Sequence, residues 1–146
     1  MTNEFPQVLT IAGSDSDGSA GMQADLHTFF IRKTYGMSVL VAAVAGNSYG
    51  IHAAETLPLA FIDQQFEALA DDFKIKASKT GMLSDAALIG TVVKSYQTYD
   101  FGPLVVDPVI TTKHGAQLLE NESFKAQKQQ QLPFSTVDTP NFFEAQ

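Results

Sequence analysis

The chain has 146 residues, 45% of them hydrophobic and 17% charged, with no cysteine, and this composition is typical of an ordinary globular domain rather than of a disordered, collagen-like or disulfide-stapled chain. Nine basic residues against sixteen acidic ones give a net charge of -7, which argues against a nucleic-acid or anionic-membrane surface, because both need clustered cations. We therefore expect a small-molecule ligand and, since the first residues carry no secretion signal and no apolar run has spanning length, a cytoplasmic location.

The first predicted unit is a strand followed by a helix. Residues 8–12 are an apolar, β-prone run, which predicts a buried strand. A loop rich in Gly, Ser and Asp comes next and leads to a helical pattern over 22–32, with Leu26, Phe29 and Phe30 on one side. This order predicts a β-loop-α unit.

The rest of the chain repeats this alternation. The continuously apolar run 39–45 predicts a central strand covered on both faces, and a polar loop over 46–50 follows it. The later predicted elements, in chain order, are a helix over 62–73, a strand over 77–80, a helix over 86–96 capped by Asp85, a strand over 104–106, a weak polar helix over 122–132 and a strand over 136–139. Strands that alternate with helices predict parallel crossovers, and hence an α/β fold whose mostly parallel sheet has helices on both faces.

The last residues predict the beginning of another helix. Asn141 can cap a helix that begins at Phe142, and Glu144 can complete a capping box, yet the sequence ends at Gln146. We therefore expect residues 1–146 to be the N-terminal part of a single longer domain, and a frayed natural terminus is the alternative.

The loop over 13–21 lies between a strand and a helix, where α/β folds bind ligands. Its glycine spacing fits neither a P-loop nor a dinucleotide site, and its two aspartates, Asp15 and Asp17, would repel a phosphate. Two interpretations stay open. The loop either contacts ligand hydroxyls and ring nitrogens, or it is a turn whose side chains bond its own backbone.

Three acids and an amide are candidate ligand-binding groups. Asp25 lies one helical turn past Gly21, so it can accept a hydrogen bond from a ligand hydroxyl, although an exposed surface acid fits equally well. Asp107 follows a strand, where open α/β sheets place catalytic and metal-binding acids. Asn141 and Glu144 follow the next strand, and with Asp107 they could bind Mg²⁺ beside the phosphates of a nucleotide; helix capping alone is the alternative.

Six segments, in order along the chain, carry a family pattern: LTIAGSD (9–15), AGMQADL (20–26), YG (35–36), KTGML (79–83), VDPV (106–109) and TPNFFEA (139–145). Together they resemble the hydroxymethylpyrimidine and pyridoxine kinases of the ribokinase-like superfamily. The resemblance implies a ribokinase-like α/β fold, ATP with Mg²⁺, and phosphoryl transfer to the hydroxymethyl group of a heteroaromatic alcohol. Since family members continue well beyond this length, it also implies the N-terminal part of one ribokinase-like kinase domain, without its C-terminal part. We further expect a homodimer.

The same resemblance assigns residues to the site. The positions that contact the ring match Gly13, Asp25, Val44, Gly46, Tyr49, His52, Met82 and Val109. Asp107 and Glu144 match the region that organises the metal, and Lys113, Asn141 and Glu144 match the region of the ATP phosphates. No catalytic residue is expected in this chain, because the family's glycine-rich anion hole and its Cys or Asp base lie further along. The fragment alone is therefore expected to be inactive.

The ring substrate is the finer question. Hydroxymethylpyrimidine kinases typically have Gln where this chain has Gly46, and glycine offers no amide to the pyrimidine nitrogens. Tyr49 and His52 look more like the loop of the B6-vitamer kinases, where an aromatic and a histidine lie close to the ring. We therefore expect a pyridoxine, pyridoxal or pyridoxamine kinase. A hydroxymethylpyrimidine/phosphomethylpyrimidine kinase of thiamine biosynthesis is the alternative, and a non-catalytic ring-binding fragment is the second.

Overall fold

A computed structural model of the chain describes residues 5–109, 121–142, 144 and 145. The strands are β1 (Gln7–Ala12), β2 (Tyr35–Leu40), β3 (Ala42–Asn47), β4 (Gly50–Thr56), β5 (Ala77–Thr80), β6 (Leu104–Val106) and β7 (Val137–Asp138). The helices are α1 (Gly21–Ile31), α2 (Leu59–Asp72), α3 (Ala86–Thr98) and α4 (Asn121–Ala126), and α4 continues into a π-helical turn (Gln127–Gln131) and a 3₁₀ turn (Leu132–Phe134). None of the helices in these ranges is long and apolar enough to cross a membrane.

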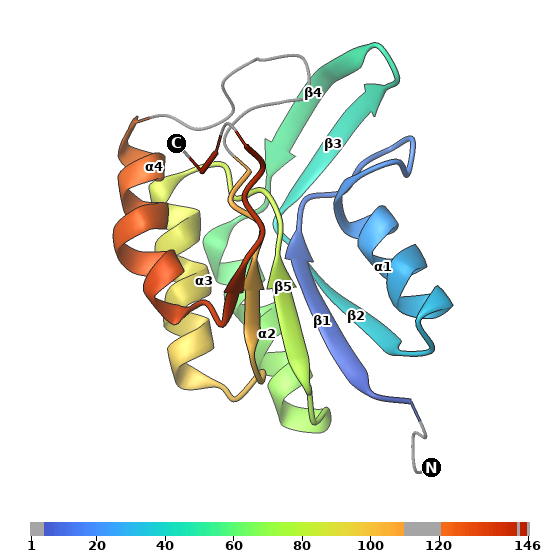
Figure 1. Cartoon of the computed structure of the whole chain (residues 1–146), viewed down its shortest axis with the longest axis vertical. Coiled ribbons are helices and arrows are strands. Elements are labelled where there is room, and N and C mark those ends of the chain that lie inside the picture. The colour runs from blue at the N-terminus through green and yellow to red at the C-terminus, as the bar shows by residue number, and fades with distance from the viewer. Residues whose placement is uncertain (1–4, 110–120, 143, 146) are drawn as a thin grey trace.

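The main sheet has five strands in the order β2-β1-β5-β6-β7, and every neighbouring pair is parallel. Helix α1 covers one face, and α2, α3 and α4 lie on the other (Figure 1). The predicted α/β class and the helices on both faces are therefore confirmed. All strands of this sheet end at the same edge, because parallel strands share a direction.

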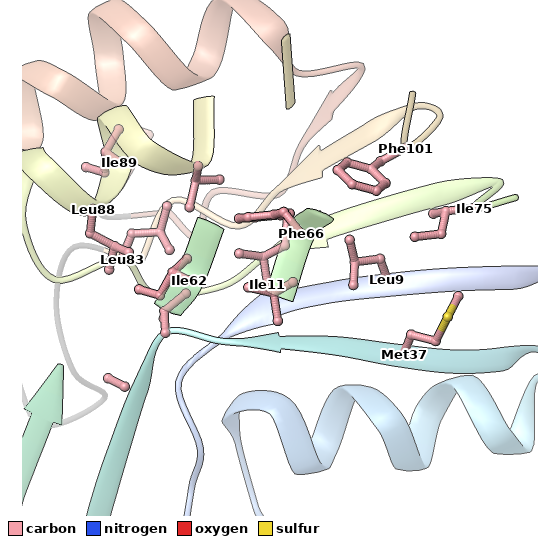
Figure 2. Close-up of a cluster of buried hydrophobic side chains, with 14 of the residues drawn as sticks. Leu9, Ile11, Met37, Ile62, Phe66, Ile75, Leu83, Leu88, Ile89 and Phe101 are labelled. Atoms are coloured by element: carbon pink, nitrogen blue, oxygen red, sulfur yellow. The ribbon is translucent and has the colours of Figure 1, made fainter. Parts of the chain in front are cut away.

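The hydrophobic core lies between the sheet and the helices α2 and α3 (Figure 2). Leu9 and Ile11 of β1 point into it and pack with Ile62 and Phe66 of α2. Because side chains alternate along a strand, Thr10 between them points to the opposite face, towards α1. The sheet thus has an apolar face under α2 and α3, and a polar row on its other face.

The apolar run 39–45 is divided between two sheets, so the prediction of one central strand covered on both faces is wrong. β2 lies at the edge of the main sheet, and β3 belongs to a separate two-stranded sheet with β4. Val39 and Val41 are buried, whereas Ala43 and Ala45 are exposed. An alanine side chain gains little from burial, so the second half of the run can leave the core at small cost.

The prediction of a polar loop over 46–50 is also wrong. β3 continues to Asn47, a tight turn follows at Ser48 and Tyr49, and the chain returns antiparallel as β4 from Gly50. Figure 1 shows this hairpin projecting beyond the carboxyl edge of the main sheet. All of β4 after its first residue is exposed, so no hydrophobic alternation signals the strand.

Helix α1 forms within one residue of its predicted bounds, but its three large apolar residues do not share a face. Leu26 and Phe29 pack against Gly36 of β2, where a Cβ would lie 3.0 Å from each side chain. Phe30 is 81% exposed. The whole of α1 contains no buried residue, so this face of the sheet is covered less completely than the face under α2 and α3.

The remaining predictions agree with the structure except at the end of the chain. The predicted strand over 77–80 is β5, and Asp85 caps α3 by accepting from the backbone of Leu88 at 2.8 Å. The weak helix predicted over 122–132 is α4 and its π-helical continuation. Residues 141, 142, 144 and 145 form a turn rather than a helix.

Candidate active site

Polar side chains gather on the α1 face of the sheet, where β1, β5 and β6 approach their carboxyl ends. Lys79 Nζ donates to both carboxylate oxygens of Asp25, at 3.1 and 3.0 Å. Thr10 Oγ1 donates to one of these oxygens at 2.6 Å. The same Lys79 ammonium lies 3.7 Å from a carboxylate oxygen of Asp107, just after β6. The structure therefore joins two predicted site acids through one lysine.

Asp107 lies in an environment that disfavours its charge. Burial raises the pKa of the Asp107 carboxyl above its ordinary value, and the negative charges of Glu144 and Asp25 raise this pKa further. The Lys79 ammonium acts in the opposite direction and offsets part of the rise. A bound cation would favour the ionised form of this carboxyl.

Asn141 and Glu144 form the predicted capping box. The Asn141 backbone N–H donates to Glu144 Oε2 at 2.9 Å, and the Glu144 N–H donates to Asn141 Oδ1 at 3.1 Å. The Thr139 N–H donates to Val106 O at 3.0 Å, which holds this segment beside the end of β6. The two reciprocal bonds of a capping box are therefore present, although the described residues here form a turn and not a helix, and the same arrangement brings Glu144 close enough to Asp107 to raise its pKa.

The aspartates of the first loop serve the loop itself. Asp15 accepts from the backbone N–H of Ala20 at 2.8 Å, and Asp17 accepts from the N–H of Ser19 at 2.8 Å. The loop's side chains therefore bond its own backbone, as one of the two interpretations predicted, and contact of this loop with a ligand stays a prediction. These contacts orient the chain as it enters α1 and hence set the position of Asp25.

Of four predicted ring positions, three come shortly after strands of the main sheet, and Val44 lies on β3 beside the loop after β1. Gly13 follows β1 and lies against β3, where a Cβ would be 3.5 Å from Ala42 O. Val44 is tied to the same loop, because its N–H donates to Ser14 Oγ at 3.0 Å. Met82 and Val109 follow β5 and β6, which are adjacent and parallel, and both side chains are partly buried.

The other two side chains predicted at the ring lie on the hairpin. The side chain of Tyr49, in the turn between β3 and β4, is 92% exposed. His52 is exposed on β4. In this structure solvent rather than the remaining ring positions surrounds Tyr49, so a ring contact by either residue stays a prediction.

Gly46 occupies an irregular point of the hairpin. The β3–β4 register shifts between Ala45 and Gly46, and a Cβ at Gly46 would lie 3.0 Å from the backbone oxygen of Gly50. The hydroxyl of Ser16 accepts from the Gly46 N–H at 2.8 Å and donates to the Gly46 carbonyl at 2.6 Å. A side chain here would require the two hairpin strands to move apart slightly.

Asp107 and Glu144 fit a magnesium ion that is also bound by phosphates better than a metal ion bound by protein side chains alone. Within the described ranges, no group of three or more His, Asp or Glu residues could hold a metal ion. Magnesium is usually bound through one or two carboxylates, with water and phosphate oxygens completing the shell. Asp107 and Glu144 supply such a pair, and their mutual repulsion is what a divalent cation relieves. Lys113, predicted at the phosphates, lies outside the described residues.

Lys79 and Thr10 were not among the predicted site residues. Both lie in short strands, where periodicity indicates at most which face of the sheet a residue occupies. Two signals were present in the sequence. Both residues fall inside segments of the family pattern, LTIAGSD (9–15) and KTGML (79–83), and a lysine inside a strand of the sheet needs a partner for its charge. Nothing in the linear spacing identifies that partner, since Asp25 is 54 positions away.

The comparisons with known proteins agree with this architecture. A family model described as phosphomethylpyrimidine kinase matches residues 15–146. The hydroxymethylpyrimidine/phosphomethylpyrimidine kinase of Streptomyces coelicolor is 47% identical over 139 residues, which are 95% of this chain and 51% of that protein. The chain therefore spans about half the length of this curated relative.

Two solved structures have the same fold. The crystal structure of phosphomethylpyrimidine kinase from Clostridium difficile 630 matches with a TM-score of 0.92 and 43% identity, over 96% of this chain and 61% of that one. The pyridoxal kinase of Staphylococcus aureus in complex with ADP matches with a TM-score of 0.85 and 38% identity, over 97% and 51%. The predicted ribokinase-like fold is thus confirmed, and the relatives' names favour the pyrimidine kinases over the B6 kinases. The chain belongs to the phosphomethylpyrimidine kinase family.

Proposed function

We propose that the protein transfers a phosphate group from ATP to the hydroxymethyl group of a pyrimidine, as a hydroxymethylpyrimidine/phosphomethylpyrimidine kinase. The observation that carries this proposal is the cluster of Asp25, Lys79 and Asp107 at the carboxyl ends of the strands. The 47% identity to a relative of that name supports the pyrimidine as substrate. The first expectation, a B6 vitamer, becomes the second candidate.

In this proposal Asp25 binds the ring alcohol. Its side chain is 18% exposed, and Thr10 and Lys79 hold the carboxylate from the protein side, so its open side can accept a hydrogen bond from the substrate. Gly13, Val44, Met82 and Val109 would surround the ring with backbone and apolar side chains. Such a site supplies orientation, which is most of what phosphoryl transfer requires from a protein.

Asp107 and Glu144 would hold Mg²⁺ at the nucleotide end, with Asn141 and Lys113 near the phosphates. The bound ion supplies positive charge that stabilises the phosphate oxygens during transfer. The ADP complex of the Staphylococcus aureus relative supports ATP as the phosphate donor. By the family resemblance, the anion hole and the catalytic base belong to a segment outside these 146 residues.

The second candidate, a pyridoxine or pyridoxal kinase, is favoured by one specific observation. Gly46 has no side chain to read a pyrimidine, and the hairpin leaves only 3.0 Å between a Cβ there and the Gly50 oxygen. The likeness to the Staphylococcus aureus pyridoxal kinase agrees with it.

Steady-state kinetics of the native gene product with both ring classes test the proposal. We expect Mg²⁺-dependent consumption of ATP and a larger kcat/KM for hydroxymethylpyrimidine than for pyridoxine or pyridoxal. A larger kcat/KM for pyridoxine would replace the first candidate by the second. Tight ring binding without turnover would favour the non-catalytic ring-binding alternative.

A further inference from the structure

Lys79 lies between two carboxylates that the proposed function uses at different ends of the reaction. Its Nζ is 3.0 Å from Asp25, proposed at the ring, and 3.7 Å from Asp107, proposed at the metal and phosphates. The side chains of Lys79, Asp25 and Asp107 are 23%, 18% and 36% exposed. Charges at this depth are screened only partly by water, so the pairing matters more than on an open surface.

The backbone around Lys79 is held from both sides. β5 pairs with β1 on one side and β6 on the other, and Lys79 lies opposite Thr10 and Val105. Thr10 holds Asp25 in turn, through the 2.6 Å hydrogen bond to its carboxylate. The ammonium therefore extends from a rigid position in the interior of the sheet.

Gly81, directly after β5, leaves room for the ammonium of Lys79. A Cβ at Gly81 would lie 3.3 Å from Lys79 Nζ and 3.3 Å from Ala12 Cβ. Both distances are tighter than ordinary van der Waals contact. The absence of a side chain at Gly81 thus lets Lys79 reach along the strand towards both acids.

We propose that Lys79 is a positioning residue that holds the carboxylates of Asp25 and Asp107 in one site and so couples the ring end to the phosphate end. Without the ammonium, the two carboxylates repel each other and turn towards water, which moves both binding groups at once. The identity of what the carboxylates bind rests on the proposed function; the coupling itself rests on the contacts above.

The test compares Lys79→Met and Lys79→Arg with Lys94→Met, a matched control on the exposed surface of α3. For Lys79→Met we expect KM for the ring alcohol to rise and kcat to fall, each by about tenfold or more, as follows from losing hydrogen bonds to charged groups. Lys79→Arg keeps the charge and should recover part of both losses. Thr10→Val loosens Asp25 alone and should raise the ring KM with kcat unchanged.

A purely structural role predicts another pattern. If Lys79→Met only lowers the amount of folded protein, the apparent kcat falls, and KM for the ring alcohol and KM for ATP stay at the level of the control. That result, or Lys79→Met kinetics equal to those of Lys94→Met, overturns the proposal. If Lys79→Met does not fold, Gly81→Ala is the second variant, because it keeps all three charges of the cluster but crowds Lys79 Nζ. It should shift ring KM and kcat together, and unchanged values overturn the proposal.

A second measurement separates this proposal from the proposed function. Wild-type protein that phosphorylates neither ring class refutes the proposed function only. The holding role of Lys79 is then decided by urea unfolding, where Lys79→Met should unfold at lower urea than Lys94→Met. Adding Asp25→Asn to Lys79→Met removes the repulsion and should restore part of the midpoint. A Lys79→Met midpoint equal to that of the control overturns the inference.

Discussion

Asp107 combines a proposed chemical role with a cost in stability. Burial raises its pKa, Glu144 and Asp25 raise it further, and Lys79 offsets only part of the rise. A carboxyl whose pKa is higher in the folded protein than in the unfolded chain is less stable when ionised in the fold. Carboxyls with a raised pKa are frequent at binding and catalytic sites, which agrees with the role proposed for Asp107.

The first prediction concerns the activity of Asp107→Asn. Removing this charge should lower kcat by about 100-fold, because it weakens charge stabilisation at the phosphates. Affinity for the ring alcohol should change little, since Asp25 and its two partners remain. Steady-state kinetics and ring titration check this in the native gene product, and an equal loss of ring affinity in a folded variant would contradict the assignment.

The second prediction concerns the stability of the same variant. At neutral pH Asp107→Asn should unfold at higher urea than wild type, because the unfavourable charge is gone. The difference should shrink as the pH falls through the raised pKa of Asp107 and vanish below the ordinary aspartate value of about 3.9, where both side chains are neutral. Urea titrations at neutral pH and below the ordinary aspartate pKa, with a chelator in the buffer, measure the difference between the two unfolding midpoints. An Asp107→Asn protein less stable than wild type at neutral pH would refute the prediction.

The third prediction concerns ring choice at Gly46. Gly46→Gln should raise the ratio of kcat/KM for hydroxymethylpyrimidine to that for pyridoxine, if the added amide reads the pyrimidine. Because a Cβ there meets the Gly50 oxygen at 3.0 Å, the hairpin must open slightly, and some loss for both substrates is expected. Gly46→Ala introduces the same Cβ without the amide and is the control. An equal ratio in both variants would contradict a reading role.

At the scale of elements, the β3–β4 hairpin depends on serine hydroxyls of the first loop. Ser14 accepts from the Val44 N–H at 3.0 Å, and Ser16 bonds both the N–H and the carbonyl of Gly46. Through these side chain–backbone hydrogen bonds, the loop after β1 holds one edge of β3 in place. This explains how an arm with few buried side chains keeps a defined direction beside the proposed ring site.

The fourth prediction follows from these bonds. Ser16→Ala should speed amide hydrogen exchange at Gly46 by about 5- to 10-fold, since one backbone hydrogen bond contributes about 1 kcal/mol. Ser14→Ala should do the same at Val44, and each variant is the control for the other. Exchange measured by NMR checks both, and an unchanged rate at Gly46 in Ser16→Ala would contradict the dependence of the hairpin on the Ser16 hydroxyl.

For the molecule as a whole, exposed apolar side chains set an expectation about association. Phe30, Ile31, Tyr49, Val137 and Phe142 are each at least half exposed. In the part of the chain that the structure describes, β7 pairs with β6 alone and β2 pairs with β1 alone, so neither edge of the main sheet has a further neighbouring strand. An open edge and an apolar surface both favour contact with further polypeptide. The expected homodimer remains a prediction, which sedimentation of the native gene product would test.

The fifth prediction is that these 146 residues expressed alone do not form a stable, catalytically active monomer. Exposed apolar surface costs about 25 cal/mol per Å², so a few hundred square ångströms approach the usual net stability of about 5–15 kcal/mol. Denaturant titration and sedimentation should show association or partial unfolding. A cooperative monomeric transition with ATP-dependent kinase activity would contradict both the instability and the placing of the catalytic groups outside this segment.

Much of the fold could be predicted because local patterns carry it. The cap at Asp85 and the helices α2 and α3 follow from capping chemistry and apolar periodicity, which act within a few residues. Failures occurred where local patterns are degenerate. Alanine-rich sequence after Val41 suits a buried or an exposed strand equally, and the exposed β4 has no apolar alternation at all.

The sequence by itself determined the α/β class, the order of the elements outside the β3–β4 hairpin and the candidacy of Asp25, Asp107 and Glu144, because strand ends and capping motifs are local features. Only the tertiary structure decided that Lys79 joins Asp25 to Asp107. That contact brings together residues from β5, α1 and the segment after β6, and the parallel order of the sheet creates it. Spacing along the chain cannot encode such a contact, since the crossovers, and not the sequence separation, bring strand ends together.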